Sequence, residues 1–166
     1  MLLHVGVISA QTPQSTLNGV QINIFAAYPA LESQAKEFGE SYIKKDFERL
    51  VRLTLPAYVK SHGREQLLRE FAATREKEML LLAARGAEIA SWSPSEATQL
   101  IEDGGLLYAV VPTTLKIKAA ENIAETPICL IAVSADHGAQ WSFISATCIN
   151  VKRAFPAVAD RLVLCS

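Results

Sequence analysis

A chain of 166 residues in which 50% are hydrophobic has the size and apolar content of one domain with one core. Its formal net charge of -1 supplies no basic excess to hold a polyanion, so we exclude nucleic-acid binding. The longest apolar runs, at residues 79–84 and 128–133, fall far short of the roughly 20 residues that cross a bilayer, so no membrane span is expected.

Residues 1–27 are expected to form a leader or tail outside the domain. Residues 2–10 are a short apolar stretch that ends in small residues, as in the region before a signal-peptide cleavage site. The stretch lacks a positively charged start, so a simple N-terminal tail is the alternative. The sequence therefore leaves open whether the protein is exported, to a periplasm or the medium, or cytoplasmic.

Apolar residues recur at steps of three and four between Leu31 and Tyr42, and Pro29 suits a first helical turn. This spacing predicts a helix over residues 29–45. Asp46 is expected to cap a second, short helix.

Pro56 is expected to stop the second helix, and residues 57–63 to turn the chain. An apolar stripe then predicts a long helix over residues 64–85, which Gly86 ends.

From residue 87 onward the hydrophobic period changes from about four to two. Five strands are expected, over residues 87–92, 98–101, 106–118, 128–134 and 140–151. A linker over residues 119–127 and an apolar strap over residues 155–164 complete the chain. Helices that precede an antiparallel meander indicate the α+β class, with N-terminal helices packed on a curved antiparallel sheet.

The long strand has two unlike faces. Its odd-numbered residues from Leu107 to Ile117 are apolar, apart from one threonine, and are expected to line the interior. The even-numbered face carries Tyr108, Val110, Pro112 and Thr114, followed by lysines.

The chain has three widely spaced cysteines, which form no metal or redox motif. Cys129 and Cys148 lie in apolar runs and are interpreted as small core residues, and Cys165 as free near the end. No metal or other cofactor is expected.

Three motifs carry a family resemblance: residues 42–47 (YIKKDF), residues 55–63 (LPAYVKSHG) and residues 134–143 (SADHGAQWSF). Together with the order of elements they resemble the NTF2-like superfamily, which includes cystatin-like, SnoaL-like and ketosteroid isomerase-like proteins. The chain looks most similar to small bacterial members with no assigned activity. The resemblance implies a single domain over residues 28–166, shaped as a cone whose pocket opens between a long helix and a bent sheet. It also implies a homodimer formed through the outer face of the sheet.

Asp136 and His137 stand side by side in the third motif and could suggest a catalytic pair. Asp136 can instead bond the amides of a turn, and Gly138 can supply a positive φ. A hairpin tip has no wall to exclude water, so we interpret the motif as a turn.

Six residues are candidates for ligand binding, and each also has a structural role to fill as a core residue, a cap or a turn. They are Tyr42, Asp46, Tyr58, His62, Trp92 and Trp141.

Two functions follow from these residues. The first is a noncatalytic domain that binds a small hydrophobic ligand in the cone, mediates dimerisation, or both, and the apolar strand face favours it. The alternative is an isomerase- or dehydratase-type enzyme that uses Tyr42 and Asp46 with His62 or Glu88, because enolate chemistry needs a carboxylate base and a neutral donor. An exported accessory protein that acts on a larger partner is a third possibility.

Overall fold

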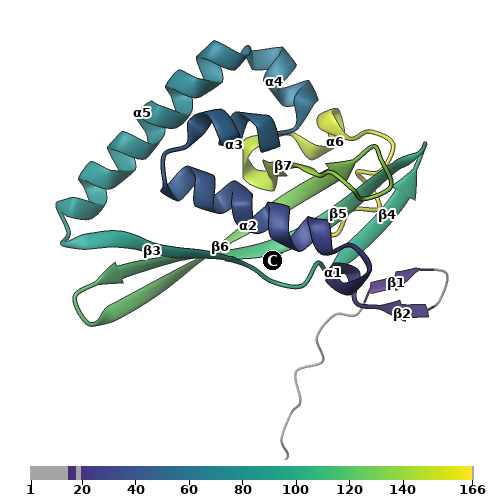
Figure 1. Cartoon of the computed structure of the whole chain (residues 1–166), viewed down its shortest axis with the longest axis horizontal. Coiled ribbons are helices and arrows are strands. Elements are labelled where there is room, and N and C mark those ends of the chain that lie inside the picture. Colours follow the sequence, from purple (N-terminus) through teal and green to yellow (C-terminus); the bar gives the residue numbers. More distant parts are fainter. Residues whose placement is uncertain (1–14, 18–19, 166) are drawn as a thin grey trace, which may run out of the picture.

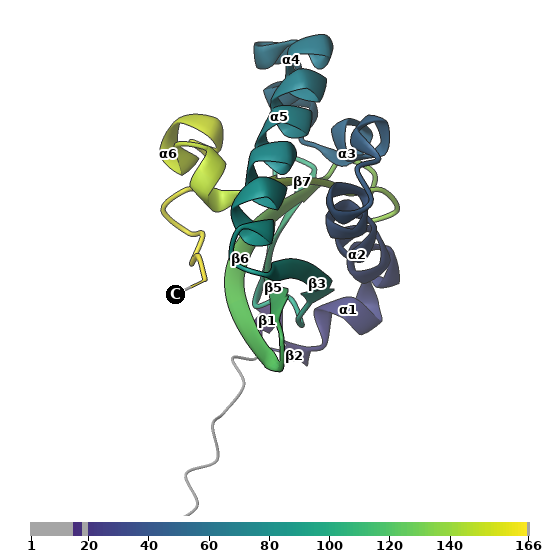
Figure 2. The same ribbon diagram turned by 90° about the vertical axis from the view of Figure 1, so that its left-hand side faces the viewer.

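The computed structural model describes residues 15–17 and 20–165, and its fold belongs to the expected α+β class. Helices from the first half of the chain lie over one face of a curved antiparallel sheet, which forms a half-barrel (Figure 1). The C-terminal segment lies on the other side of the sheet (Figure 2). No helix within the described ranges is both long and apolar enough to cross a membrane. Residues 2–10, the candidate leader, lie outside the described residues.

Three short elements precede the main helical layer. Strands β1 (Ser15–Leu17) and β2 (Val20–Ile22) pair as a separate antiparallel ribbon, and α1 (Ile24–Ala27) follows. Ile24 is 0% exposed and Phe25 8% exposed. The packed core therefore starts at α1, inside the range expected to be a leader or tail.

Helix α2 (Pro29–Ile43) confirms the first predicted helix, with Pro29 in its first turn. Its stripe of Leu31, Ala35 and Gly39 is buried against the core. This is the one-sided apolar pattern expected of a helix that packs on a sheet.

Helix α3 (Phe47–Leu53) begins where its cap predicts. The Asp46 carboxylate accepts the backbone N–H of Arg49 at 3.1 Å, which satisfies one of the free donors of the first turn. The long helix α5 (Arg64–Ala83) is also confirmed.

The segment before α5 differs from the prediction, because it forms helix α4 (Pro56–His62) where we expected a turn. Pro56 occupies the first helical turn, where the missing N–H costs no hydrogen bond. Gly63, at φ 84°, then redirects the chain into α5. The same proline thus follows one helix and starts the next.

The main sheet is built around its longest strand, β5 (Leu106–Ala119). Strand β3 (Ala87–Pro94) pairs with the second half of β5, and β4 (Gln99–Asp103) with the first half. The other edge of β5 pairs with β6 (Asn122–Ser134), which in turn pairs with β7 (Ser142–Ser145).

The predicted linker over residues 119–127 is wrong, because β5 and β6 continue into one long hairpin. Their pairing runs without interruption as far as Ala119 and Asn122. Residues 122–127 are exposed, so neither face of this part of β6 is selected to be apolar. A strand without a buried face has no alternating signal to read.

The last predicted strand, over residues 140–151, is mostly wrong as well. Only β7 is extended, and the chain continues as the 3₁₀-helix η1 (Ala146–Cys148) and helix α6 (Val151–Ala154). The Asn150 side chain caps α6 by accepting the N–H of Arg153 at 3.0 Å. A side chain that bonds the nearby backbone in this way favours a helical turn over an extended strand at this point of the chain.

The two faces of β5 are buried by different parts of the chain. Leu107, Ala109 and Val111 pack toward α1 and α2, as expected for the odd-numbered face. On the other face the ring of Tyr108 meets that of Phe155 edge-on at 5.9 Å. The C-terminal strap is therefore confirmed, as the cover of the outer face.

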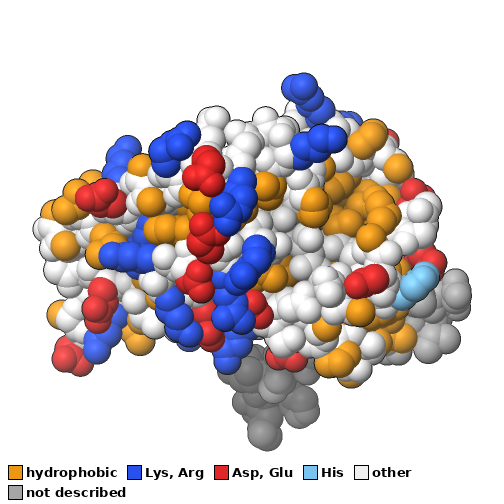
Figure 3. All heavy atoms as spheres, turned by 45° about the horizontal axis from the view of Figure 1, so that its top comes forward, with side chains coloured by type: hydrophobic (Ala, Val, Ile, Leu, Met, Phe, Trp, Pro, Cys, Tyr) orange, Lys and Arg blue, Asp and Glu red, His pale blue; other side chains and the backbone are white. Residues whose placement is uncertain are grey.

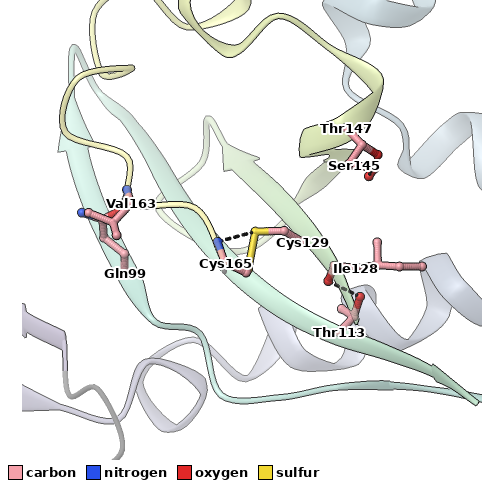
Figure 4. Close-up of a disulfide and its surroundings, with 8 residues drawn as sticks. All are labelled: Gln99, Thr113, Ile128, Cys129, Ser145, Thr147, Val163 and Cys165. Atoms are coloured by element: carbon pink, nitrogen blue, oxygen red, sulfur yellow. Dashed lines mark hydrogen bonds between the residues drawn. A yellow bond between two sulfur atoms is a disulfide. The ribbon is translucent and has the colours of Figure 1, made fainter. Parts of the chain in front are cut away.

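The cysteines are placed differently from the prediction. Cys129 of β6 forms a disulfide with Cys165, with their Cα atoms 5.5 Å apart (Figure 4). Cys148 is exposed and free. Contact across 36 residues of sequence depends on how the strap folds back, which spacing alone does not reveal.

Candidate ligand-binding site

Helix α2 contacts Trp92 of β3 through Gly39 and two residues of α5 through Tyr42, and both neighbours carry a buried donor without a partner among the described residues. The Trp92 indole packs on α2 at Gly39, where any Cβ would overlap the ring. Trp92 is 8% exposed, and its Nε1–H has no hydrogen-bond partner among the described residues. Glycine at position 39 thus lets the ring approach the helix backbone and sets the position of this donor.

Tyr42 lies one turn further along α2 and connects it to α5. Its hydroxyl donates to the Glu78 carboxylate at 2.9 Å. The guanidinium of Arg75 lies over the Tyr42 ring, 5.6 Å from its centroid, in cation–π contact.

Arg75 is the most deeply buried charged residue of the cluster, with 7% exposure. Its Nη1 pairs with Glu78 at 3.3 Å. Its Nε–H has no hydrogen-bond partner in the described part of the chain. A buried donor without a partner costs about 1–3 kcal/mol, so Arg75 Nε and Trp92 Nε1 are each a position where an added hydrogen-bond acceptor would be favourable.

The charges of this cluster balance, since one guanidinium faces one carboxylate. Burial, followed by the negative charge of Glu78, raises the pKa of Tyr42, so its hydroxyl stays protonated at neutral pH. Glu78 Oε2 is occupied by both Tyr42 and Arg75. The site can therefore donate hydrogen bonds to a ligand, but it holds no uncompensated charge to attract an ion.

Asp46 lies away from this cluster, in the hollow between α2 and α3. The hollow has a volume of about 340 Å³, and charged side chains of both signs line it. Ion pairs such as Lys44–Glu40 at 2.9 Å tie these side chains together. Figure 3 shows positive and negative side chains interleaved on this side of the molecule. We read this hollow as a solvated charged surface.

Tyr58 and His62 form their own pair on α4. Their ring centroids are 4.0 Å apart, and His62 Nδ1 lies 3.0 Å from the Tyr58 carbonyl oxygen. Burial, and secondarily the charge of the nearby Cys148, raises the pKa of Tyr58. The structure thus joins these two candidates to each other.

Trp141 is part of the 134–143 hairpin. Its Nε1–H donates to the carbonyl of Gly138 at 3.0 Å, and its ring meets Tyr28 edge-on. Unlike Trp92, this indole has its hydrogen bond satisfied within the turn.

The turn interpretation of the 134–143 motif is confirmed. The Asp136 carboxylate accepts the Gln140 N–H at 2.9 Å and the Ser134 hydroxyl at 2.8 Å. These bonds, the backbone one first, lower the pKa of Asp136. Gly138 has φ 91° as expected. A second hollow of about 320 Å³ separates this hairpin from the start of α4.

The sequence interpretation missed Arg75, Glu78 and Gly39. Arg75 lies four residues after Phe71 and eight after Leu67, on the buried stripe of α5. A charged residue in an apolar stripe is a readable signal, because burying a charge requires a partner.

No protein-family model and no curated protein match the chain. A solved structure from Catenulispora acidiphila matches at 13% identity with a TM-score of 0.47, covering 74% of this chain and 93% of that chain. The chain is similar to that protein at the level of a weak structural likeness.

Proposed function

We propose that this chain is a noncatalytic NTF2-like domain that binds a small apolar molecule carrying one uncharged hydrogen-bond acceptor. The observation that carries the proposal is the pair of buried donors, Arg75 Nε and Trp92 Nε1, without partners in the described residues. A carbonyl or ether oxygen satisfies such donors. A carboxylate would add a net negative charge to a buried, balanced pair, which is unfavourable.

Apolar side chains on the same elements support the hydrophobic body of the ligand. Phe38 and Ile43 of α2 and Ile89 of β3 pack on the core while staying partly exposed. Helices over a curved antiparallel sheet are compatible with the NTF2-like resemblance of the sequence. These side chains would contact the apolar body of a ligand bound beside α2 and β3.

The positions of the polar residues that an isomerase or dehydratase would use give less support to the enzyme alternative than to ligand binding. Tyr42 bonds Glu78, whereas Asp46 caps α3 and His62 stacks on Tyr58. Glu88 is exposed. A base and a neutral donor aimed at one point would be needed for enolate chemistry, so we place binding first.

The test compares three probes of equal chain length: a medium-chain methyl ketone, the corresponding hydrocarbon and the corresponding carboxylate. Binding is followed by native mass spectrometry and by tryptophan fluorescence. We expect the ketone to bind several-fold more tightly than the other two, because a hydrogen bond contributes about 1 kcal/mol net. Equal binding of ketone and hydrocarbon would overturn the role of the two donors.

Two variants assign the effect to the site. Arg75→Lys keeps the positive charge beside Glu78 and removes Nε, and Trp92→Phe removes Nε1; each should erase the preference for the ketone. Trp141→Phe is the matched control, since its Nε1 bonds Gly138, and it should keep the preference. A loss of preference in all three variants would contradict the assignment.

A homodimer is the second candidate function. At the end of α5, Leu80 and Leu81 are 67% and 55% exposed, and Ile123 of β6 is 62% exposed. Over residues 122–127, which are exposed, β6 pairs only with β5 among the described residues, so this edge has no strand partner that a second copy would have to displace. Dimerisation through the outer face of the sheet, which the sequence led us to expect, has less surface available, because Val110 on that face is already 0% exposed within one chain.

Light scattering after size exclusion tests the dimer. We expect a dimer at micromolar concentration that Leu80→Glu dissociates, with Val163→Glu as an equally exposed control. A monomeric mass for the unmodified protein would rule this candidate out.

A further inference from the structure

The segment that follows α6, residues 155–165, covers the outer face of the sheet without helix or strand of its own. Phe155 and Val158 are 7% and 1% exposed and pack in a cluster with Tyr108 and Ile131. Beyond α6 no helix or strand is formed within the described residues. This segment, which we call the C-terminal strap, therefore cannot rely on a backbone ladder.

The noncovalent contacts at the end of the strap are few and exposed. The Gln99 amide bonds the carbonyl of Arg161 at 2.7 Å and the N–H of Val163 at 2.9 Å. Arg161 also pairs with Asp103 at the surface. Exposed pairs of this kind contribute little, and Val163 itself is 71% exposed.

The disulfide lies where these contacts end. Cys165 is bonded to Cys129, and its N–H also donates to Cys129 Sγ at 3.0 Å (Figure 4). Cys129 is the residue of β6 just before the pairing with β7 begins at Leu130. The bond thus fixes the end of the strap to the part of the sheet that no further strand covers.

We propose that this disulfide is a maturation step that seals the strap over the outer face, and that the chain reaches its final fold in an oxidising compartment. Two thiols lose two protons and two electrons when the bond forms, and a disulfide of an oxidant protein or of a small-molecule disulfide takes up the electrons by thiol–disulfide exchange. Such bonds form and persist in oxidising compartments and are rare where thiols are kept reduced.

Because the chain has a third cysteine, the proposal must also account for which two cysteines pair. Cys148 is exposed and free, so it is available to pair wrongly during oxidation. Docking of Phe155 and Val158 on the outer face brings Cys165 within reach of Cys129, which favours this pairing over one with Cys148. The inference is independent of the proposed ligand.

Thiol counting on the full chain tests the bond. Protein oxidised in a glutathione buffer typical of an oxidising compartment should show one reactive thiol out of three cysteines under denaturing conditions, and three after reduction. Peptide mapping should find Cys129 linked to Cys165. Three free thiols, or a bond that includes Cys148, would overturn the proposal.

Hydrogen exchange tests the seal. Relative to the oxidised protein, Cys165→Ser should exchange at least about tenfold faster over residues 156–165, while peptides from β5 and the inner part of β6 keep their protection. Cys148→Ser, the control, should exchange like the unmodified protein. Equal exchange in Cys165→Ser and the oxidised protein would show that the strap is sealed without the bond.

Expression in two compartments tests the location. Chain directed to an oxidising compartment should carry the bond and melt roughly 5–10 °C higher than chain kept in a reducing cytosol. Equal melting temperatures, or a complete bond in the reducing cytosol, would contradict the requirement for oxidation.

Discussion

The inner and outer faces of the sheet are buried by two different strategies. Regular helices cover the inner face, and within residues 20–165 their apolar stripes meet a matching strand face with no disulfide between them. The outer face is covered by the irregular C-terminal strap, and a disulfide closes it. The comparison teaches that amphipathic helices need only their periodicity to dock, whereas a segment with little regular structure needs a few anchors and a tether.

The two faces also differ in their polar content. Over the helical layer and the inner face, Arg75 and Trp92 keep buried donors that find no partner in the part of the chain that the structure describes, which makes this side the better candidate for a ligand. On the outer face the polar contacts of the strap are made at its exposed rim, as in the pairing of Gln99 with Val163. We therefore place the proposed ligand on the inner face and assign a stabilising role to the strap on the outer face.

The largest effect should come from Phe143→Ala on the inner face. Phe143 is 0% exposed and packs against Phe38 with ring centroids 5.6 Å apart. The cavity left by the ring should lower the free energy of unfolding by about 4 kcal/mol in urea denaturation. Phe143→Leu, the control, should lose less than half of that amount, and equal losses would show that the surrounding side chains do not hold the cavity open.

The second-largest loss of stability should come from Cys165→Ser on the outer face. Loss of a link between residues 36 apart in the sequence should lower the free energy of unfolding by about 3 kcal/mol under oxidising conditions. Under reducing conditions the variant and the unmodified protein should be equally stable. A difference that persists after reduction would assign the effect to the side chain and not to the bond.

A smaller loss is expected from Gly39→Ala on the inner face. The added methyl group overlaps the Trp92 ring and should lower the free energy of unfolding by about 1–3 kcal/mol, even though alanine favours helices. In a Trp92→Leu background the same change should cost much less. A cost that is the same in both backgrounds would mean that the indole is not the obstacle.

The smallest expected effect is the pH-dependent stability that Asp136 contributes to the 134–143 hairpin. The pKa of Asp136 is lowered in the folded protein, so its ionised form contributes stability above the usual aspartate pKa of about 3.9, and this contribution is lost as the pH falls through the lower folded-state pKa. Asp136→Asn should therefore be slightly less stable than the unmodified protein at pH 7. The difference between the two melting temperatures should start to shrink below about pH 4 and vanish once the pH is below the folded-state pKa of Asp136, and a constant gap would exclude ionisation as the cause.

The sequence predicted the fold class and most of the helical layer, because these depend on local signals. The stripe from Leu31, the cap at Asp46 and the odd-numbered face of the long strand all appear as expected. The candidate site was predicted in part. Tyr42 and Trp92 are both buried against α2 or its neighbours, but the α5 partners of Tyr42 and the glycine that seats Trp92 were not recognised.

Local sequence thus determined the long helices and the buried face of the long strand, since burial of one face imposes a readable period. Only the tertiary structure decided what has no such period: the exposed hairpin of β5 and β6, the path of the strap, and the pairing of Cys129 with Cys165. It also decided that Arg75 finds its counter-charge on the same helix and its aromatic platform on another. Contacts between distant residues follow from how the layers pack, and no short stretch of sequence contains that information.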